Sequence, residues 1–504
     1  MQRNTGQPLR ETGMLLGIDL GTTGCKAAVY SVTGELLGEN YLECPLVKPS
    51  PGVVEQDAAL WWDLTREAIR QALCAANVDG HTVRALSVSS QGISFVPVDE
   101  SGRPLSNAIS WLDTRAMAEV GTILNRYSEA DLFALTGKRA SPVYLLPKLL
   151  WLRCHRPEIY NRASKFLMAH DYLLCQLTGR FVTDPSMAGG TLIYDIRGLE
   201  WNRGLLAAFQ IPEERLPEVR WAGTSLGQIR PEVARELGLS EAVMVVVGGQ
   251  DQKCAALGAG IRPGAATVSL GTATAITCVT DHPVLDPHRC IPVFPFVRRE
   301  KWALEGVVGT SGAALKWLLQ TFFPGQSYRK LDELAAGSPP GSNGVRFYPH
   351  LMGATSPHWR ADVWGAFLGL TLAVGSGDMV RSLLEGVAFQ IRTNLQVIEG
   401  MGISVEELIL FGGGSRSPLW PQIISDVTGK SVVVPPTVDM ATWGACILAG
   451  HGVGALTDGD RELLTARGGR SHFYPQPEAV KRYEEVYHQY IKQEEKLMME
   501  NGSR

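Results

Sequence analysis

One short pattern occurs twice in this chain of 504 residues, and it limits the folds that the chain can adopt. The tripeptide Leu-Gly-Thr lies between two apolar runs at residues 20–22 and again at residues 270–272. Such apolar runs are typical of buried strands, and the small residues between them are typical of a tight turn. A turn of small residues leaves backbone N–H groups able to point at a single oxyanion. The repeat therefore predicts two similar halves, each offering a backbone cradle to one nucleotide.

An acidic residue lies beside the first cradle. Asp19 follows the apolar run at residues 15–18, and a second apolar run follows the turn at residues 27–30. A carboxylate normally repels a phosphate, but Mg²⁺ between them removes the conflict because the ion binds carboxylates together with phosphate oxygens. An ordinary hairpin with an exposed aspartate explains this stretch equally well. The second copy of the pattern favours the nucleotide site.

The composition of the chain argues against some classes of binding partner. The net charge of −4 gives no basic footprint for nucleic acid or a membrane surface. Apolar runs such as residues 242–247 are far too short to span a bilayer, and residues 1–13 contain no apolar signal segment. Nine scattered cysteines without a CxxC pair indicate reduced thiols. We therefore expect a cytoplasmic protein without nucleic-acid or membrane partners, and its length predicts two or three domains.

Glycine-rich loops follow apolar strands at further places. The apolar run at residues 243–247 leads into the loop 248–252, and the run at residues 408–411 leads into residues 412–415. Residues 309–312 form another such loop. In open α/β sheets, ligands bind where strands end in loops of this kind. No loop fits the P-loop pattern GxxxxGK[ST], so a P-loop enzyme is excluded.

Taken together, these segments resemble the FGGY family of carbohydrate kinases, and the resemblance covers nearly the whole chain. The matching segments of the first half are residues 17–22 (GIDLGT), 51–57 (PGVVEQD), 111–115 (WLDTR) and 148–151 (KLLW). Those of the second half are residues 271–272, 365–370 (GAFLGL), 378–385 and 411–415 (FGGGS). No single segment is specific, but their order and spacing are.

The resemblance implies an α/β fold of the actin/Hsp70/sugar-kinase type. It has two actin-like (ribonuclease H-like) domains with a nucleotide cleft between them. We expect residues 1–258 to bind the sugar and carry the catalytic base, and residues 259–504 to bind ATP. The implied reaction uses ATP with Mg²⁺ and transfers a phosphoryl group to a hydroxyl of a small sugar or polyol.

The resemblance also implies roles for single residues. Asp251, in the family's Gly-x-Asp-Gln loop, matches the catalytic base and also contacts the acceptor, while Asp19 matches the residue that holds Mg²⁺ through water. The residues expected to bind the nucleotide are Thr22, Thr23, Lys26, Gly271, Thr272, Gly309, Thr310, Ser311, Gly413, Gly414 and Ser415. The remaining residues expected to contact the acceptor are Gln91, Gly92, Trp111 and Asp113.

The sequence leaves the acceptor open. Residues 91–94 are Gln-Gly-Ile-Ser, where xylulokinases carry Gln-Met-His-Gly and glycerol kinases carry Gln-Arg-Glu-Thr. Residues 111–115 are nearer the glycerol kinase form, whereas residues 412–420 are nearer the xylulokinase form. Leu145 also departs from the small residue that the family pattern expects there. We expect a ketose or sugar alcohol, most closely the pentulose of a xylulokinase, with glycerol or another polyol as runner-up.

Two further points stay open at this stage. An ATP-driven switch of the actin/Hsp70 type is the alternative from a different functional class, because a fold alone does not fix a function. The loop around Asp251 and the segment around Trp111 favour the kinase. A homodimer is one arrangement that the sequence leaves open.

Overall fold

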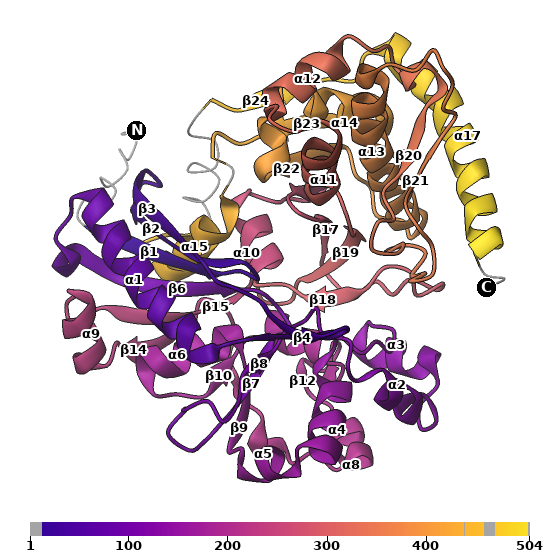
Figure 1. Ribbon diagram of the computed structural model, residues 1–504. Coiled ribbons are helices and arrows are strands. Elements are labelled where there is room, and N and C mark those ends of the chain that lie inside the picture. Colours follow the sequence, from indigo (N-terminus) through magenta and orange to yellow (C-terminus); the bar gives the residue numbers. More distant parts are fainter. Residues whose placement is uncertain (1–12, 438, 458–468, 502–504) are drawn as a thin grey trace, which may run out of the picture. The chain divides into compact units, whose positions relative to one another are not determined.

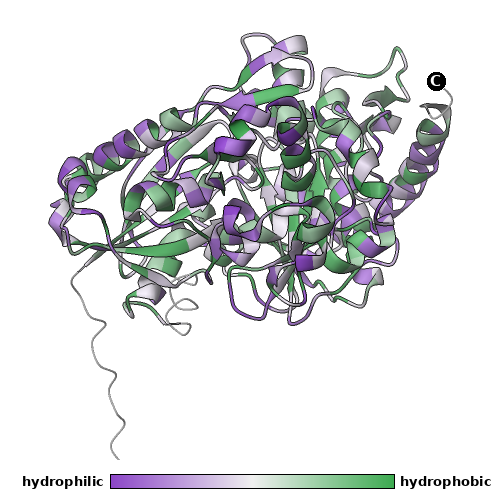
Figure 2. Ribbon diagram, turned by 90° about the horizontal axis from the view of Figure 1, so that it is seen from below, coloured by the Kyte–Doolittle hydropathy of each residue, from purple (hydrophilic) through white to green (hydrophobic). Residues whose placement is uncertain are grey.

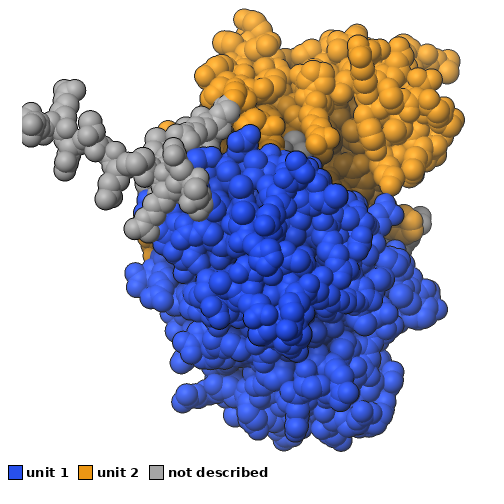
Figure 3. Space-filling view, turned by 90° about the vertical axis from the view of Figure 1, so that its left-hand side faces the viewer, with its two compact units in different colours: residues 1–260, 294–301, 440–466 blue, residues 261–293, 302–439, 467–504 orange. Residues whose placement is uncertain are grey.

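The computed structural model describes residues 13–437, 439–457 and 469–501 (Figure 1). It contains two compact units, which Figure 3 distinguishes by colour. The first unit comprises residues 1–260, 294–301 and 440–466, and the second comprises residues 261–293, 302–439 and 467–504. The compact units are therefore not two consecutive halves of the chain. The assignment of sugar binding to residues 1–258 and of ATP binding to residues 259–504 stays a prediction.

The main sheet of the first unit has the strand order β14-β15-β6-β1-β2-β3. Its strands are β1 (Met14–Leu20), β2 (Gly24–Ser31), β3 (Leu36–Glu43), β6 (Val83–Ser90), β14 (Ser225–Gln228) and β15 (Met244–Gln250). β6 runs parallel to both of its neighbours, β1 and β15, whereas β1 and β2 form an antiparallel hairpin. The strands predicted from the apolar runs at residues 15–18, 27–30 and 243–247 are confirmed.

Helices cover both faces of this sheet: α1 (Ala58–Ala76), α6 (Ala169–Thr178), α10 (Asp251–Gly258) and α15 (Met440–Gly452). Leu16 and Ile18 belong to a core that includes residues of α1 and α6. Gly17 faces the other way, because a Cβ there would lie 2.2 Å from the carbonyl oxygen of Thr442 in α15. Since alternate residues of a strand point to opposite faces, β1 is buried on both sides, as is usual for parallel strands in α/β folds.

The rest of the first unit is built around a five-stranded sheet of order β4-β5-β8-β7-β9. Its strands are β4 (Val47–Ser50), β5 (Val53–Gln56), β7 (Phe95–Val98), β8 (Ala108–Ile109) and β9 (Lys165–Met168). Two pairs of short strands are β10 (Val182–Thr183) with β13 (Glu218–Val219), and β11 (Tyr194–Asp195) with β12 (Glu200–Trp201). The remaining helices are α2 (Met117–Leu124), α3 (Glu129–Thr136), α4 (Leu145–His155), α5 (Pro157–Arg162), α7 (Pro185–Ala188), α8 (Arg203–Phe209) and α9 (Pro231–Leu237).

The second unit contains a sheet in which strands β19-β17-β16-β22-β23-β24 lie side by side in that order. They are β16 (Ala265–Leu270), β17 (Thr274–Thr280), β19 (Trp302–Val308), β22 (Glu407–Phe411), β23 (Ser431–Val434) and β24 (Ser471–Phe473). The other strands in this part of the chain are β18 (Val293–Pro295), β20 (Arg346–Tyr348) and β21 (Ala366–Leu368). The helices are α11 (Gly312–Phe322), α12 (Tyr328–Ala336), α13 (Ser376–Gly400), α14 (Trp420–Thr428) and α17 (Pro477–Asn501).

Figure 2 colours each residue by its hydropathy, and both hydrophobic and hydrophilic residues occur along the helices. Both colours alternate along α17, where Tyr483 and Tyr490 are fully buried while Met499 is exposed. This amphipathic pattern is expected of a helix that packs on a core with one face. Among the described residues, no helix is both long enough and apolar enough to cross a bilayer.

Candidate active site

The carboxyl ends of three neighbouring parallel strands bring the predicted catalytic groups of the first unit together. In the register of the sheet, Asp19 in β1 faces Ser89 in β6, and Gln250 in β15 faces Ser90. Asp251 follows β15 directly and opens α10. Asp19 and Asp251 therefore lie at the same edge of one sheet, which is where ligands bind in open α/β folds.

The carboxylate of Asp19 is oriented by its neighbour on β6. Ser89 Oγ donates a hydrogen bond of 2.7 Å to Asp19 Oδ1. Lys26 faces Asp19 across the hairpin, and its Nζ lies 3.2 Å from Glu39 Oε2. In the described part of the chain, no group of three or more His, Cys, Asp or Glu residues is arranged to hold a metal. One carboxylate still fits Mg²⁺, because this ion commonly binds one or two carboxylates together with substrate phosphates and water.

Asp251 lies in the first turn of α10. Its Oδ1 accepts a hydrogen bond of 2.7 Å from the backbone N–H of Gln252 and a second one from the side-chain amide of Gln250. A negative charge at this position is favoured by the dipole of the helix. The side chain is only partly buried, so a bound hydroxyl can approach it.

Two residues behind this loop were not found by sequence reasoning. Ser186 Oγ accepts a hydrogen bond of 3.0 Å from the backbone N–H of Gln250, and Ser186 N donates in turn to Asp184 Oδ2 at 2.9 Å. Asp184 is fully buried, and burial raises its pKa to about 6 although His170 and the hydrogen bonds from Ser186 and Met187 oppose the rise. Asp184 and Ser186 thus support the backbone that presents Asp251. The Asp-Pro-Ser sequence of a helix start was their only local signal.

Cys254 lies one turn into α10, and its thiol packs in the protein interior next to the candidate site. It is completely buried. Burial, followed by the carboxylates of Asp184, Asp19 and Asp251, raises the pKa of this thiol well above its ordinary value. The thiol is therefore protonated and unreactive at neutral pH.

The first predicted phosphate cradle is joined to the predicted acceptor segment. The hairpin turn is closed by a hydrogen bond of 2.9 Å from Gly21 N to Gly24 O, and Thr23 O accepts one of 2.8 Å from Cys44 N. Trp111 Nε1 donates a hydrogen bond of 2.8 Å to Thr22 Oγ1. The structure thus places Thr22 and Trp111, which are far apart in the sequence, in direct contact.

The residues other than Asp251 that are predicted to contact the acceptor differ in their exposure to solvent. The Asp113 carboxylate is fully buried, and it accepts hydrogen bonds from Val54 N at 2.6 Å and from Arg115 Nε at 2.9 Å. The Gln91 amide is also buried. Trp111, by contrast, is 36% exposed. A contact of Asp113 or Gln91 with the acceptor stays a prediction.

Gly92, which is also predicted to contact the acceptor, packs against the loop of the predicted base. A Cβ at Gly92 would lie 3.1 Å from Gln250 Cγ, so a larger residue would press on this loop. The next residue, Ile93, has φ = 73°, in the left-handed region. A β-branched residue there is a conformational outlier, and strain of this kind costs about 1–3 kcal/mol and is concentrated at functional sites. Ile93 stands where xylulokinases carry histidine.

A buried lysine fixes the backbone in front of Trp111. Lys148 Nζ donates a hydrogen bond of 2.6 Å to the carbonyl oxygen of Ser110. Burial lowers the pKa of Lys148 to about 7, although the nearby Asp113 carboxylate opposes the shift. Lys148 therefore supports the backbone of the predicted acceptor segment.

The second predicted cradle is formed by two loops of the second unit. Ser311 Oγ donates a hydrogen bond of 3.0 Å to Gly271 O, and Ser311 N donates one of 3.1 Å to Thr272 O. A Cβ at Gly312 would lie 2.5 Å from the same Gly271 oxygen, so only glycine allows the loops to approach this closely. The structure thus brings the predicted segments 271–272 and 309–311 together at the N-terminus of α11, and such a helix start favours a bound anion.

A third loop joins this cradle because β16 and β22 are parallel neighbours. Their register pairs Ser269 with Phe411, so the loops after the two strands leave the same edge of the sheet. A Cβ at Gly414 would lie 2.6 Å from Leu270 side-chain atoms, whereas one at Gly413 would meet no described heavy atom within 4 Å. Ser415 Oγ donates to Gly412 O at 2.7 Å and closes the turn. The open space at Gly413 fits the close approach of a flat ligand.

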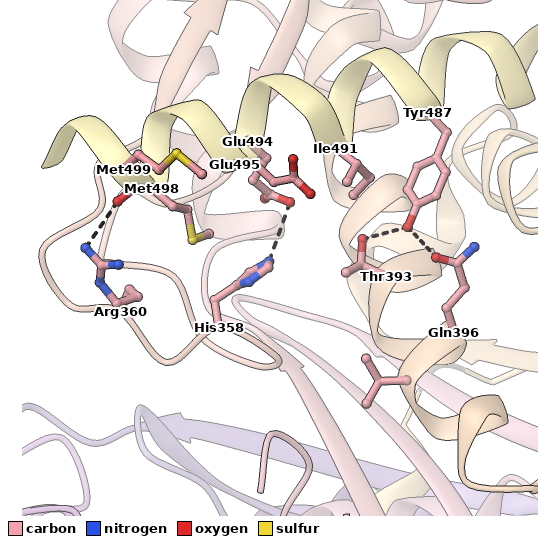
Figure 4. Close-up of a pocket in the computed structure, with 11 residues that line it drawn as sticks. His358, Arg360, Thr393, Gln396, Tyr487, Ile491, Glu494, Glu495, Met498 and Met499 are labelled. Atoms are coloured by element: carbon pink, nitrogen blue, oxygen red, sulfur yellow. Dashed lines mark hydrogen bonds and ion pairs between the residues drawn. The ribbon is translucent and has the colours of Figure 1, made fainter. Parts of the chain in front are cut away.

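A cavity lies elsewhere in the second unit (Figure 4). It measures about 690 Å³ and is lined by residues of α13, α17 and the loop around His358. None of the predicted site residues lines it. Two of the side chains that line it have acidic neighbours: His358 Nε2 lies 3.5 Å from Glu494 Oε2, and Arg360 pairs with Asp362 at 2.7 Å. This cavity is therefore not part of either cradle.

Comparisons with known proteins agree with this geometry. Residues 14–258 match the FGGY family of carbohydrate kinases, N-terminal domain, and residues 266–453 match the C-terminal domain of the same family. The chain is 31% identical to a xylulose kinase from Staphylococcus epidermidis over 442 residues, covering 88% of each chain. It is 30% identical to a gluconokinase from Bacillus subtilis, covering 89% of each. The solved structure of ligand-bound xylulose kinase from Lactobacillus acidophilus superimposes with a TM-score of 0.91 at 26% identity, covering 97% of this chain and 99% of that one.

Proposed function

Because this chain belongs to the FGGY family of ATP-dependent carbohydrate kinases, we propose that it phosphorylates a hydroxyl of a ketose or sugar alcohol, most closely a pentulose. The observation that supports this proposal is the edge of the first sheet. Three adjacent parallel strands end there at Asp19, at the loop 91–94 and at Asp251. A phosphate-side acid, an acceptor loop and a base are the parts that phosphoryl transfer to an alcohol needs.

In the proposed mechanism, Asp251 accepts the proton of the attacking hydroxyl. The hydrogen bonds from Gln252 and Gln250 hold one of its oxygens in place, and Ser186 supports the loop from behind. The exposed ring of Trp111 packs against the carbon skeleton of the acceptor. Gly92 has no side chain, so it leaves space beside Gln250. Positioning of this kind supplies most of the catalysis in phosphoryl transfer.

The nucleotide is proposed to bind through the two cradles. Thr22, Thr23 and Lys26 in the first unit face the transferred phosphate. The three loops of the second unit hold the other phosphates and, at Gly413 and Gly414, the nucleoside. Mg²⁺, when bound, would neutralise phosphate charge, and Asp19 is the residue that would hold it.

The identity of the acceptor is the finer part of the proposal. Relatives of similar identity are named xylulose kinase and gluconokinase, so the family leaves several acceptors open. The second-half segment 412–420 favours the pentulose. The lack of a histidine at Ile93 and the form of residues 111–115 keep glycerol and other polyols as the alternative.

An assay of ADP release tests the proposal with D-xylulose, other pentuloses, glycerol and D-gluconate as acceptors. We expect the highest kcat/KM with a pentulose and the loss of this activity in Asp251→Asn. Asp63→Asn, an exposed aspartate on α1, is the matched control and should leave the activity unchanged. A clear preference for glycerol or gluconate would replace the pentulose. ADP release that no acceptor stimulates would favour the ATP-driven switch.

A further inference from the structure

A closed ring of hydrogen bonds links the first phosphate cradle to the acceptor segment. Its members are Thr22, Gln56, Gln91, Ser94 and Trp111, and we call them the hydrogen-bonded ring. All five lie in the first unit. They come from the β1–β2 turn, the end of β5, the loop after β6, and the turn after β8.

Five hydrogen bonds close the ring, and both branches run from donors on Trp111 to acceptors on Thr22. The backbone N–H of Trp111 donates to Ser94 Oγ at 3.0 Å, and Ser94 Oγ donates to Gln91 Oε1 at 3.0 Å. Gln91 Nε2 donates to Gln56 Oε1 at 2.9 Å, and Gln56 Nε2 donates to Thr22 O at 2.9 Å. The indole of Trp111 completes the ring by donating to Thr22 Oγ1 at 2.8 Å.

The interior part of the ring is inaccessible to water. Gln56 and Ser94 are 0% exposed and Gln91 is 1% exposed. Both ends of each buried amide have a partner within the ring, as buried polar groups require. A buried and fully satisfied network of this kind is rigid, and its members act as a unit.

The bond from Trp111 leaves the proton of the Thr22 hydroxyl available for donation. A threonine hydroxyl has one proton and two acceptor lone pairs. Because Thr22 Oγ1 accepts from the Trp111 indole, its own proton remains for donation to another group, such as a phosphate oxygen in the cradle. The same bond also sets the position of the Trp111 ring.

We propose that the hydrogen-bonded ring couples the phosphate cradle to the acceptor segment during transfer. The positioning residues of the ring are Gln56, Gln91 and Ser94. They fix the positions of Thr22 and Trp111 relative to each other without touching the reacting atoms. This inference rests on the proposed function, since it gives Thr22 a phosphate and Trp111 an acceptor. It also explains why Gln91, expected to contact the acceptor, is buried.

Two variants test the ring from its buried side. Gln56→Leu removes two of its hydrogen bonds, and Ser94→Ala, which is a smaller change, removes the two at the opposite side. We expect each variant to lower kcat by up to about 10²-fold, the cost of a small misplacement at a reacting centre, with KM for ATP little changed. Gln56 and Ser94 form no hydrogen bond with each other within the ring, and if they acted independently their effects on kcat would multiply. The ring instead predicts that the double variant is hardly slower than the slower single variant.

A second readout does not need activity. Protein labelled at tryptophan gives an NMR signal for each indole N–H, and the signal of Trp111 among the 12 tryptophans is identified by its absence in Trp111→Phe. We expect this signal to move in Thr22→Val, which removes its acceptor, and also in Gln56→Leu and Ser94→Ala. Gln71→Leu, on the outer part of α1, is the matched control and should leave both kcat and the signal unchanged.

The outcomes separate this inference from the proposed function. An indole signal that stays in place in both buried variants, or effects on kcat that multiply in the double variant, would overturn the ring as a coupling device. Wild-type protein that phosphorylates no acceptor would overturn the proposed function instead. The indole signal would still decide whether the five residues are coupled.

Discussion

Ser89 donates a hydrogen bond of 2.7 Å to the carboxylate of Asp19 across the parallel strands β6 and β1. The bond is made where both strands end, and Ser89 is fully buried. A hydroxyl that donates to a carboxylate holds the carboxylate in one orientation. The pair therefore has the arrangement expected of a metal-side acid with a supporting neighbour.

Removal of the Asp19 carboxylate should raise the requirement for Mg²⁺. In Asp19→Ala we expect the Mg²⁺ concentration for half-maximal activity to rise by about 10–100-fold and turnover to fall, with KM for the acceptor little changed. Ser89→Ala should show the same change on a smaller scale, because it removes one supporting hydrogen bond of about 1.5 kcal/mol. Titration of activity with MgCl₂ measures both. An unchanged Mg²⁺ dependence in Asp19→Ala would remove the residue from the metal site.

Replacement of Asp251 by asparagine should abolish most of the chemistry while the fold is retained. The amide keeps the size of the side chain and can still accept from Gln252, but it cannot take up the proton of the attacking hydroxyl. We expect turnover to fall by about 10²–10⁴-fold. Binding of ATP, measured by calorimetry, should stay near the wild-type value. Near-normal turnover in this variant would require another base.

Much of the fold could be predicted because its signals are local. The buried strands β1, β15 and β22 are apolar runs that end at glycine-rich turns, and each was found within a few residues of its observed bounds. The return of α15 to the first unit could not be predicted. Residues 440–450 are apolar on almost every side, so the periodicity does not indicate which sheet they cover. The close approach of Gly444 to the Cys254 carbonyl oxygen, where a Cβ would lie at 1.9 Å, is visible only in three dimensions.

For the candidate site, too, some features could be predicted from the sequence and others could not. The glycine turns follow apolar runs, Asp19 lies at the end of β1 and Asp251 directly follows β15, so their place at the sheet edge could be predicted. The partners of these residues could not, because they come from distant parts of the chain: Gln56 and Gln91 are 35 residues apart. No local sequence signal distinguishes a buried glutamine that is hydrogen-bonded to another glutamine from one that contacts a ligand. The predicted acceptor contact of Gln91 rested on its position in the motif alone.

A pH-dependent contribution to stability is expected from Glu494 in α17. It is 2% exposed, and its Oε1 lies 2.9 Å from His350 Nε2 and accepts from Gln390 Nε2. Burial alone would raise the pKa of this carboxyl, but the contacts with His350 and His358 lower it to about 2. A lowered pKa stabilises the fold above the unfolded value of 4.5, and this stabilisation, about 3 kcal/mol, is lost as the pH falls from there to about 2.

The variant Glu494→Gln measures this contribution. At neutral pH we expect it to melt at a lower temperature than the wild type, and we expect the gap to narrow as the pH falls through the range in which the wild-type carboxyl is protonated. Glu495→Gln, the exposed neighbour on the same helix, is the control and should show no such gap. A gap that is constant over this range would mean that the charge of Glu494 does not stabilise the fold.

Ile93→His should shift the choice of acceptor. Ile93 occupies the position of the xylulokinase histidine, and its φ of 73° is better tolerated by histidine than by a β-branched residue, so the fold should be retained. An imidazole can donate to or accept from a sugar hydroxyl, and a net hydrogen bond of about 0.5–1.5 kcal/mol corresponds to a gain of up to about tenfold. We therefore expect kcat/KM for a pentulose to rise relative to that for glycerol. Ile93→Val, which keeps the branched apolar side chain, should leave this ratio unchanged. A ratio that falls or stays constant in Ile93→His would show that residue 93 does not face the part of the acceptor that distinguishes the two substrates.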